Sequence, residues 1–196
     1  MQMPPKVRIT RQIILQAALE IVRQKGPDAL NARSLAASIG CSVQPVFREF
    51  LSMQALRAAV VQSAQQLFDA EMLAALGGED GFLGMGMTYI GFAEREKNLF
   101  RLLFMSGGFG GASAVQVAGT TKGDDEVIAT LQGMTGLDAA RAQRLYTGIW
   151  FTTHGIASLV ATGDCTMQQE EVRQALHTTF VGLLTALRQE TEKERD

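Results

Sequence analysis

Apolar residues recur at intervals of three and four along almost the whole chain, which is the spacing of one face of an α-helix. Between Thr10 and Gly26 this pattern forms one stripe, made of Ile13, Ile14, Ala17, Ala18, Ile21 and Val22. Thr10 is a favourable N-cap residue, and Gly26 followed by Pro27 ends the stripe. No segment has the period of two that is typical of a strand. The sequence therefore predicts an all-α protein.

Start and stop signals divide the chain into about nine predicted helices. Asn31, Ser42 and Ser52 are placed to cap the second, third and fourth of them. Thr166 and Gln169 have the spacing of a capping box at the last helix. The predicted helices cover residues 11–25, 32–39, 43–50, 53–76, 82–97, 98–105, 125–134, 138–161 and 166–190. The stretch SGGFGGASAVQVAGTTKGDD (106–125) is predicted to be a loose connection.

Charge is distributed unevenly along this pattern. Residues 1–60 contain eight basic and three acidic residues, a net charge of +5, whereas the rest of the chain contains 10 basic and 17 acidic residues, a net charge of −7. A basic segment on an acidic body indicates that the first third meets a polyanion such as DNA. The alternative is that these charges only solvate helix faces.

The segment NARSLAASIGCSVQPVF (31–47) has the layout of a helix-turn-helix, in which a glycine-containing turn separates two short helices and the second lies in the major groove. The contacts between the two helices are expected from Leu35, Ala36, Ile39, Val43 and Phe47. With Ser42 as the N-cap, Pro45 occupies the third helical position. Its missing N–H costs little there, because the backbone amide at that position has no partner within the helix.

This arrangement turns Gln44 toward the bases. A glutamine amide can bond N6 and N7 of adenine, and the apolar Val43 and Pro45 can touch a thymine methyl group. A helix-turn-helix used only for packing is the alternative. The candidate DNA-binding residues are Asn31, Arg33, Ser42, Val43, Gln44, Pro45, Phe47 and Arg48.

From about Arg8 to Val61 the sequence resembles the DNA-binding domain of the TetR family of bacterial transcription regulators. The resemblance rests on Gly26, Asn31 with Arg33, the turn LAASIGCS, Phe47 and the exit FLSMQAL (50–56). QPVF (44–47) also resembles the QPTLY recognition helix of some members. The resemblance implies a helix-turn-helix domain over residues 1–52, followed by a helical effector-binding and dimerisation domain over residues 53–196.

Three residues depart from the family pattern at positions that bear on phosphate contact. Phe47 replaces a tyrosine, Glu49 replaces a histidine or similar residue, and Met53 replaces a lysine. Because phosphate contacts supply most of the sequence-independent affinity, we expect DNA binding to be weaker or to depend on other basic groups. The candidates are Lys6, Arg8, Arg11, Arg33 and Arg48. A member that binds DNA poorly, or only with a partner, is the alternative.

Two stripes in the larger part of the chain indicate a ligand site. Phe82, Met85, Tyr89 and Phe92 follow helical spacing, as do Tyr146, Trp150 and His154, and NLFRLLFM (98–105) adds further apolar residues. A mostly apolar cavity with a few polar groups is the usual make-up of a small-molecule site. Ordinary core packing is the alternative. The candidate ligand-binding residues are Met85, Tyr89, Phe92, Phe104, Met105, Tyr146, Trp150 and His154.

TYIGFAEREKNLFRLLF (88–104) and WFTTHG (150–155) resemble two patterns of one subgroup of TetR-like effector domains, often called the WHG type. Asn98 stands near the position of a proline in that pattern, so the end of the preceding helix is less defined. Gly155 is expected to permit close helix packing. A structural hydrogen bond and a ligand contact both remain open for His154.

The last two predicted helices carry a second apolar face. It consists of Ile149, Ile156, Leu159, Val172, Leu176, Phe180, Leu183, Leu184 and Leu187. The resemblance implies that these helices form a four-helix bundle in a homodimer. A dimer also lets two recognition helices meet successive major grooves, about 34–36 Å apart, on a two-fold operator.

These features predict a ligand-responsive repressor that binds a palindromic double-stranded DNA operator as a homodimer and is released by a small, largely apolar effector. The effector would enter between the fifth and eighth helices and, by moving the fourth and sixth, change the spacing of the two DNA-binding domains. Repression is taken from the commonest mode of the family. The alternative is a DNA-binding architectural protein, or a regulator without a small-molecule ligand.

Other classes of protein find little support in the sequence. There is no GxSxG or HExxH motif, and the glycines of GGFGG follow a helix and not a strand, so we expect no enzyme and no cofactor. Cys41 and Cys165 lack the spacing of a zinc site, so no metal is expected. Without a leader-like or membrane-spanning apolar run, we expect a cytoplasmic protein with no membrane contact.

Overall fold

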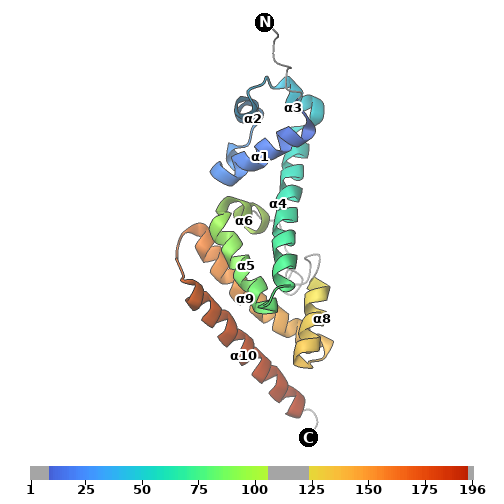
Figure 1. Cartoon of the computed structure of the whole chain (residues 1–196), viewed down its shortest axis with the longest axis vertical. Coiled ribbons are helices and arrows are strands. Elements are labelled where there is room, and N and C mark those ends of the chain that lie inside the picture. Colours follow the sequence, from blue (N-terminus) through green and yellow to red (C-terminus); the bar gives the residue numbers. More distant parts are fainter. Residues whose placement is uncertain (1–8, 106–123, 194–196) are drawn as a thin grey trace. The chain divides into compact units, whose positions relative to one another are not determined.

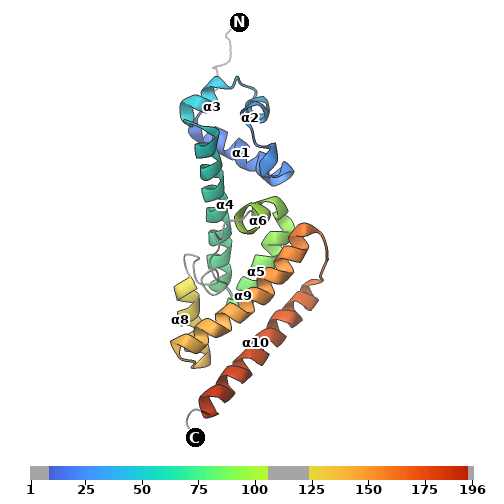
Figure 2. The same ribbon diagram turned by 180° about the vertical axis from the view of Figure 1, so that it is seen from behind.

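The computed structural model describes residues 9–105 and 124–193, and over these residues the chain forms nine α-helices, one short 3-10 helix and no strand. The all-α prediction is thus confirmed (Figures 1 and 2). The chain divides into two compact units. Unit 1 comprises Met1–Phe68 and Asn98–Ser106, and unit 2 comprises Asp69–Lys97 and Gly107–Asp196. The predicted loose connection and the basic residues Lys6 and Arg8 lie largely or wholly outside the described residues.

Unit 1 contains the helices at the start of the chain and one helix from later in the sequence. They are α1 (Arg11–Lys25), the 3-10 helix η1 (Pro27–Ala29), α2 (Ala32–Ile39), α3 (Gln44–Glu49), the first part of α4 (Met53–Leu76) and nearly all of α6 (Lys97–Phe104). The predicted caps are confirmed where the signal is local. Thr10 Oγ1 accepts the Ile13 amide at 3.3 Å, and Ser52 Oγ accepts the Ala55 amide at 3.1 Å. Gly40 ends α2 with a φ of 74°, a left-handed conformation that glycine adopts without strain.

The core of unit 1 joins α1, α2, α3 and α4. Its largest fully buried side chains include Ile14, Leu30, Leu35, Val46, Leu56 and Val60, and α6 adds Leu99 and Phe100. Two hydrogen bonds to backbone carbonyls tie distant segments together. Arg57 Nη2 donates to the Leu30 carbonyl at 3.1 Å, and Asn98 Nδ2 donates to the Arg23 carbonyl at 2.9 Å. The residue that stands near the proline position of the WHG pattern therefore fastens α6 to the end of α1.

The start and the inner face of α3 differ from the prediction. The helix begins at Gln44, with Val43 as its N-cap and no side-chain cap, so the expectation that Ser42 caps it is wrong. Pro45 lies within the first two helical positions, where its missing N–H still removes no helical hydrogen bond. Val46 (1% exposed) and Phe50 (3%) point inward, whereas Phe47, which we expected in the interior, is 45% exposed.

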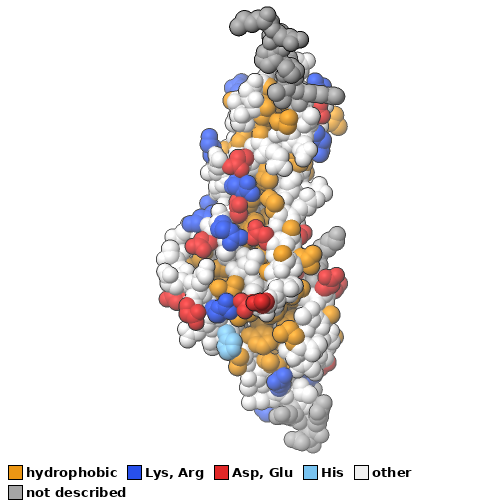
Figure 3. Space-filling model, viewed as in Figure 1, with side chains coloured by type: hydrophobic (Ala, Val, Ile, Leu, Met, Phe, Trp, Pro, Cys, Tyr) orange, Lys and Arg blue, Asp and Glu red, His pale blue; other side chains and the backbone are white. Residues whose placement is uncertain are grey.

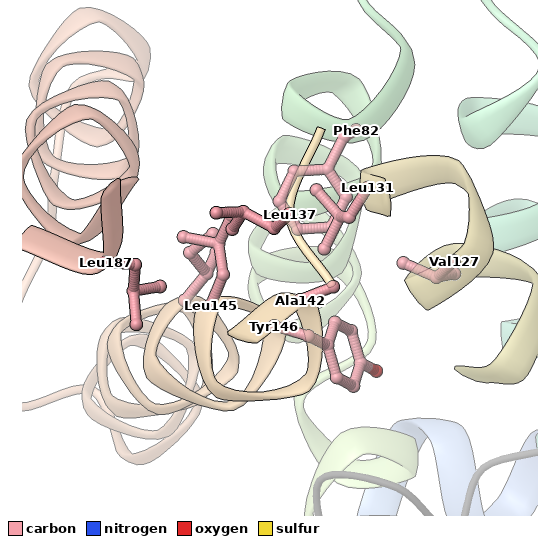
Figure 4. Close-up of a cluster of buried hydrophobic side chains, with 9 residues drawn as sticks. Phe82, Val127, Leu131, Leu137, Ala142, Leu145, Tyr146 and Leu187 are labelled. Carbon is pink, nitrogen blue, oxygen red and sulfur yellow. The ribbon is translucent and has the colours of Figure 1, made fainter. Parts of the chain in front are cut away.

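Unit 2 is built on α9. It contains α5 (Gly81–Arg95), α8 (Asp124–Thr135), α9 (Ala139–Thr162) and α10 (Gln169–Lys193) as well as the end of α4, and α5, α8 and α10 all pack against α9. A cluster of buried side chains joins α5, α8, α9 and α10, with Leu145 and Leu131 fully buried (Figure 4). Helices α9 and α10 approach closely at Gly148, where an added Cβ would lie 2.6 Å from Leu183 Cδ1. This core fixes α5 against α9, which carry the two predicted aromatic stripes.

The last helix begins later than predicted. The sequence indicated a capping box of Thr166 and Gln169, but α10 begins at Gln169. Glu171 Oε2 instead accepts the Gln168 amide at 2.7 Å, so the side chain that satisfies this helix start comes from within the first turn. This helix also ends three residues later than predicted, at Lys193, and the bounds of the other helices agree with the prediction to within two residues.

Candidate functional site

Helix α3, the predicted recognition helix, presents an exposed face of mixed chemistry. Ser42, Gln44, Phe47 and Arg48 are exposed, and Val43 and Pro45 are half-buried. The amide of Gln44 lies in the first turn of α3, which is the part of a recognition helix that meets base edges. The arrangement can therefore offer the bases a two-donor, two-acceptor amide flanked by apolar surface.

Asn31 and Arg33 sit at the start of α2. Asn31 Oδ1 accepts the backbone amides of Arg33 and Ser34 at 3.1 and 3.0 Å, and the Ser34 hydroxyl accepts the Asn31 amide, which completes a capping box. The Asn31 side chain is thus engaged in stabilising α2, although we predicted a DNA contact for it. Arg33 is exposed and its side chain can extend toward a phosphate.

Glu49, which stands where the family has a histidine or similar residue, has its negative charge partly neutralised by the neighbouring Arg48. Arg48 Nη2 lies 3.1 Å from Glu49 Oε1, and Nη2 also donates to the Ile9 carbonyl at 3.3 Å. Glu49 therefore presents less negative charge to a DNA backbone than its sequence position implies, while Arg48 must exchange these partners for a phosphate. The guanidinium of Arg11 lies 4.4 Å from the centre of the Phe50 ring, a cation–π contact that holds it on the surface of unit 1.

The exposure of Leu51 was not predicted from the sequence. This residue is 94% exposed, between the end of α3 and the start of α4. In the sequence, Leu51 is one residue of the segment FLSMQAL (50–56). Its exposure depends on how α3 and α4 meet, which the sequence pattern does not specify. Together with Phe47 it gives the α3 end of unit 1 an exposed apolar component.

In unit 2, the two aromatic stripes meet through His154. Tyr89 of α5 and His154 of α9 are joined by a 2.9 Å hydrogen bond between Tyr89 Oη and His154 Nδ1, in which the phenol donates when the imidazole carries its proton on Nε2. Trp150 stacks on His154 with ring centroids 4.7 Å apart and an interplanar angle of 5°. Burial lowers the pKa of His154, so the imidazole is neutral at pH 7.

A buried carboxylate forms a second polar centre in this unit. Asp124, at the start of α8, is only 6% exposed and accepts a 2.6 Å hydrogen bond from the Tyr146 hydroxyl. The pKa of Tyr146 is raised by burial and by the charge of Asp124, and the pKa of Tyr89 is raised for the same two reasons. Asp124 was not among the predicted site residues, because an acidic residue at a helix start is ordinarily a solvated group that interacts favourably with the helix dipole.

The structure unites some of the predicted ligand-binding residues and separates others. Met85, Tyr146 and Trp150 belong to or pack against the buried cluster of Figure 4. Phe92 is 1% exposed on α5. Phe104 and Met105 belong to unit 1, where the Phe104 ring lies 5.0 Å from that of Phe68. Tyr89, Phe92 and Tyr146 are all packed, so a ligand at this aromatic core has to displace existing contacts.

The apolar face predicted on the last two helices divides into buried and exposed parts. Ile149, Val172, Leu176 and Leu187 are buried within unit 2, so their assignment to a dimer surface is wrong for this fold. The exposed large apolar side chains of these helices are Phe151, Leu159 and Val181. Phe151, Gly155 and Leu159 lie at i, i+4 and i+8 on α9, and hydrophobic side chains gather over α9 and α10 in Figure 3.

A short helix pair with an exposed recognition helix, followed by a helical unit with a buried aromatic and polar core, defines the class of helix-turn-helix regulators with a helical second domain. The family model described as "Bacterial regulatory proteins, tetR family" matches residues 14–60. The model described as "Tetracyclin repressor-like, C-terminal domain" matches residues 82–185, more than half of the chain. The chain belongs to the TetR family and is a DNA-binding transcriptional regulator. The WHG subtype stays a prediction.

A solved structure supports the same fold. It is described as "Structure of a protein with unknown function from Rhodococcus sp. RHA1", is 24% identical and aligns with a TM-score of 0.66. The match covers 93% of this chain and 100% of that one. Among curated proteins, none matches the chain. In the part of the chain that the structure describes, no helix combines the length and the hydropathy needed to cross a membrane.

Proposed function

We propose that the chain is a ligand-responsive repressor that binds a palindromic operator as a homodimer and leaves it when a small, largely apolar molecule binds unit 2. The division into a DNA-binding domain over residues 1–52 and an effector and dimerisation domain over residues 53–196 is part of this proposal. The observation that carries it is the exposed face of α3, where Gln44 and Phe47 are presented to solvent on a helix whose other side is fully packed.

Support for a homodimer comes from the exposed face of α9. A Cβ added at Gly155 would meet nothing within 4 Å, so this glycine is not needed for packing inside the chain. It lies between Phe151 (46% exposed) and Leu159 (49%), one turn from each. A small residue between two exposed apolar side chains allows a second helix to approach closely, and burial of the two side chains would stabilise the pair.

Support for a ligand comes from the aromatic core. A neutral imidazole, two phenol groups and a carboxylate lie among apolar side chains, which is a composition suited to orienting a small molecule. The tight packing of Tyr89, Phe92 and Tyr146 favours the second candidate, a regulator or architectural protein without a small-molecule ligand. Ligand-dependent release of DNA separates the two.

The first test is a selection of fragmented genomic DNA by the purified protein at low and near-physiological salt. A specific dimeric regulator enriches a palindrome beside a few promoters at both salt concentrations, because base contacts survive when phosphate contacts are screened. Diffuse enrichment that disappears at the higher salt concentration would contradict the proposal and favour an architectural role.

The dimer is tested separately by Phe151→Glu. A buried, unpaired carboxylate at a helix–helix interface is strongly unfavourable, so we expect this variant to be a monomer by size-exclusion chromatography with light scattering. Leu73→Glu is the matched control, because Leu73 is 66% exposed on α4 and lies outside the proposed interface. A dimer that survives Phe151→Glu would place the interface on another surface.

A further inference from the structure

A groove lies on unit 2 away from the aromatic core. Its volume is about 420 Å³, within the range of small-molecule sites, and its walls come from α5, the end of α9, the α9–α10 connection and the start of α10. On α5 its residues include Met87, Gly91 and Glu94, whereas the aromatic stripe consists of Met85, Tyr89 and Phe92. At about 100° per residue these two sets lie on opposite faces of the helix, so the groove and the aromatic core are separate sites.

The floor of the groove is apolar. Ile90, Val160 and Val172 line it and are 5, 7 and 4% exposed, and Met87 and Met167 add flexible apolar surface. The end of the Arg95 side chain lies over Gly91, where an added Cβ would come within 2.9 Å of Arg95 Nη1, so a cationic group borders the apolar floor. The floor is therefore suited to a hydrocarbon body.

The charged residues of the groove are mainly basic. Arg95, Lys97 and Arg173 line it together with a single carboxylate, that of Glu94. Arg95 is paired with Glu71 at 2.6 Å and Arg173 with Asp80 at 3.1 Å, both on the surface. Exposed ion pairs of this kind are weak, and a guanidinium has donors for a second acceptor, so both arginines can also bind a ligand carboxylate.

We propose that this groove binds a small amphipathic anion, a molecule with an apolar body and one carboxylate. The apolar floor takes the body and the cationic side chains take the carboxylate. A neutral amphiphile loses the charge contacts, and a short carboxylate loses the apolar ones. The proposal concerns a site distinct from the aromatic core, and it holds whether or not the aromatic core also takes a ligand.

The two cysteines of the chain provide a reporter and its internal control. Cys165 lines the groove, Cys41 lies in the turn of the helix-turn-helix, and both are half-buried. The full-length protein is alkylated with iodoacetamide, and the rate at each cysteine is followed by peptide mass spectrometry. We expect decanoate to slow alkylation of Cys165 at least about fivefold and to leave the Cys41 rate unchanged.

Ligand controls separate the two parts of the proposed recognition. Decan-1-ol and butyrate, at the same concentration as decanoate, are expected to give no more than about a twofold change at Cys165. Equal protection by decan-1-ol would overturn the role of the cationic residues. Equal slowing at Cys41 would show a general effect on the thiols and would overturn the site.

Variants of the groove complete the test. A Cβ at Gly91 meets only the end of the Arg95 side chain, and the rest of a leucine extends into the groove, so Gly91→Leu is expected to abolish protection by decanoate. Gly133→Leu on α8 is the matched control, because a Cβ there meets nothing within 4 Å, and it is expected to keep protection. Arg173→Gln, a surface change, is expected to raise the half-protecting concentration about tenfold.

Calorimetric titration of decanoate into the parent and the Gly91→Leu variant checks binding without thiol chemistry. The proposal predicts heat of binding for the parent and none for the variant. Protection or binding heat that is unchanged in Gly91→Leu, or the absence of both in the parent, would overturn it. None of these measurements involves DNA, so they stand apart from the test of repression.

Discussion

The recognition helix and the aromatic core of unit 2 hold polar groups in opposite environments. On α3, Gln44 is exposed and can exchange water for a DNA base. In unit 2, Tyr146 and Tyr89 are buried and already bonded to Asp124 and His154. An exposed side chain can bind DNA without breaking a hydrogen bond inside the protein. A ligand that enters the aromatic core has to break or rearrange the hydrogen bonds of the buried tyrosines. The proposed ligand therefore has to offset a cost that exposed Gln44 does not carry when it meets a base.

The largest expected effect tests which side of α3 is buried and which is exposed to DNA. Phe50→Ala removes a ring that is 3% exposed, and we expect it to lower the free energy of unfolding by about 3–5 kcal/mol, the usual cost of deleting a buried ring. Phe47→Ala removes a ring that is 45% exposed, and a loss below about 1 kcal/mol is expected. Urea denaturation measures both. Equal losses would mean that the two rings are equally buried.

Within the aromatic core, the two tyrosine hydrogen bonds should differ in strength. Tyr146→Phe leaves the Asp124 carboxylate short of a donor, and hydrogen bonds to charged groups contribute about 1.5–3 kcal/mol. Tyr89→Phe removes a bond to a neutral imidazole, which contributes about 0.5–1.5 kcal/mol. The same denaturation measurement ranks them. A larger loss of unfolding free energy for Tyr89→Phe than for Tyr146→Phe would contradict the description of Asp124 as a charged carboxylate.

The protonation of His154 has a smaller effect on the free energy of unfolding, and this effect depends on pH. Its pKa in the folded chain lies below the unfolded value of 6.5, so the unfolded chain binds more protons between the two values. The contribution of His154 to the free energy of unfolding is therefore fully present above pH 6.5. It falls as the pH drops toward the folded pKa, by at most about 1.4 kcal/mol per pH unit.

Trp150 reports this titration directly, because it is the one tryptophan of the chain and stacks on His154. We expect its fluorescence to change with a midpoint below pH 6.5, and His154→Gln to remove the transition. His177→Gln, a change at the exposed histidine on α10, should leave the transition in place. A midpoint above pH 6.5 would mean that the folded chain stabilises the imidazolium.

The sequence predicted the elements whose signals are local. Thr10 and Asn31 are followed by the helices they cap, and Gly26 and Gly40 end helices, because each of these residues acts on its own neighbouring backbone. At α10 two local signals compete. One is the capping-box spacing of Thr166 and Gln169, and the other is Glu171, which accepts the Gln168 amide. The second is the one observed, and the helix begins at Gln169.

Features that depend on tertiary packing were harder to predict. Val43 with Phe47 and Val46 with Phe50 are both apolar pairs at i, i+4, and only the tertiary packing of α3, which contacts α1, decides which pair is buried. The groove joins Met87 to Arg173, which no spacing along the chain relates. A contact between distant segments also places a charged group: Arg48, which pairs with its neighbour Glu49, donates to the Ile9 carbonyl 39 positions away.

In the proposed mode of recognition Gln44 reads the DNA bases, and affinity for the selected palindrome tests this role most directly. At near-physiological salt, Gln44→Ala should weaken binding to the palindrome by about 1–3 kcal/mol, or about 5- to 150-fold, and leave binding to a scrambled duplex unchanged. Gln66→Ala, at an exposed glutamine of α4, should leave both affinities as in the parent. If Gln44→Ala binds both duplexes as the parent does, α3 does not read the sequence in the way proposed.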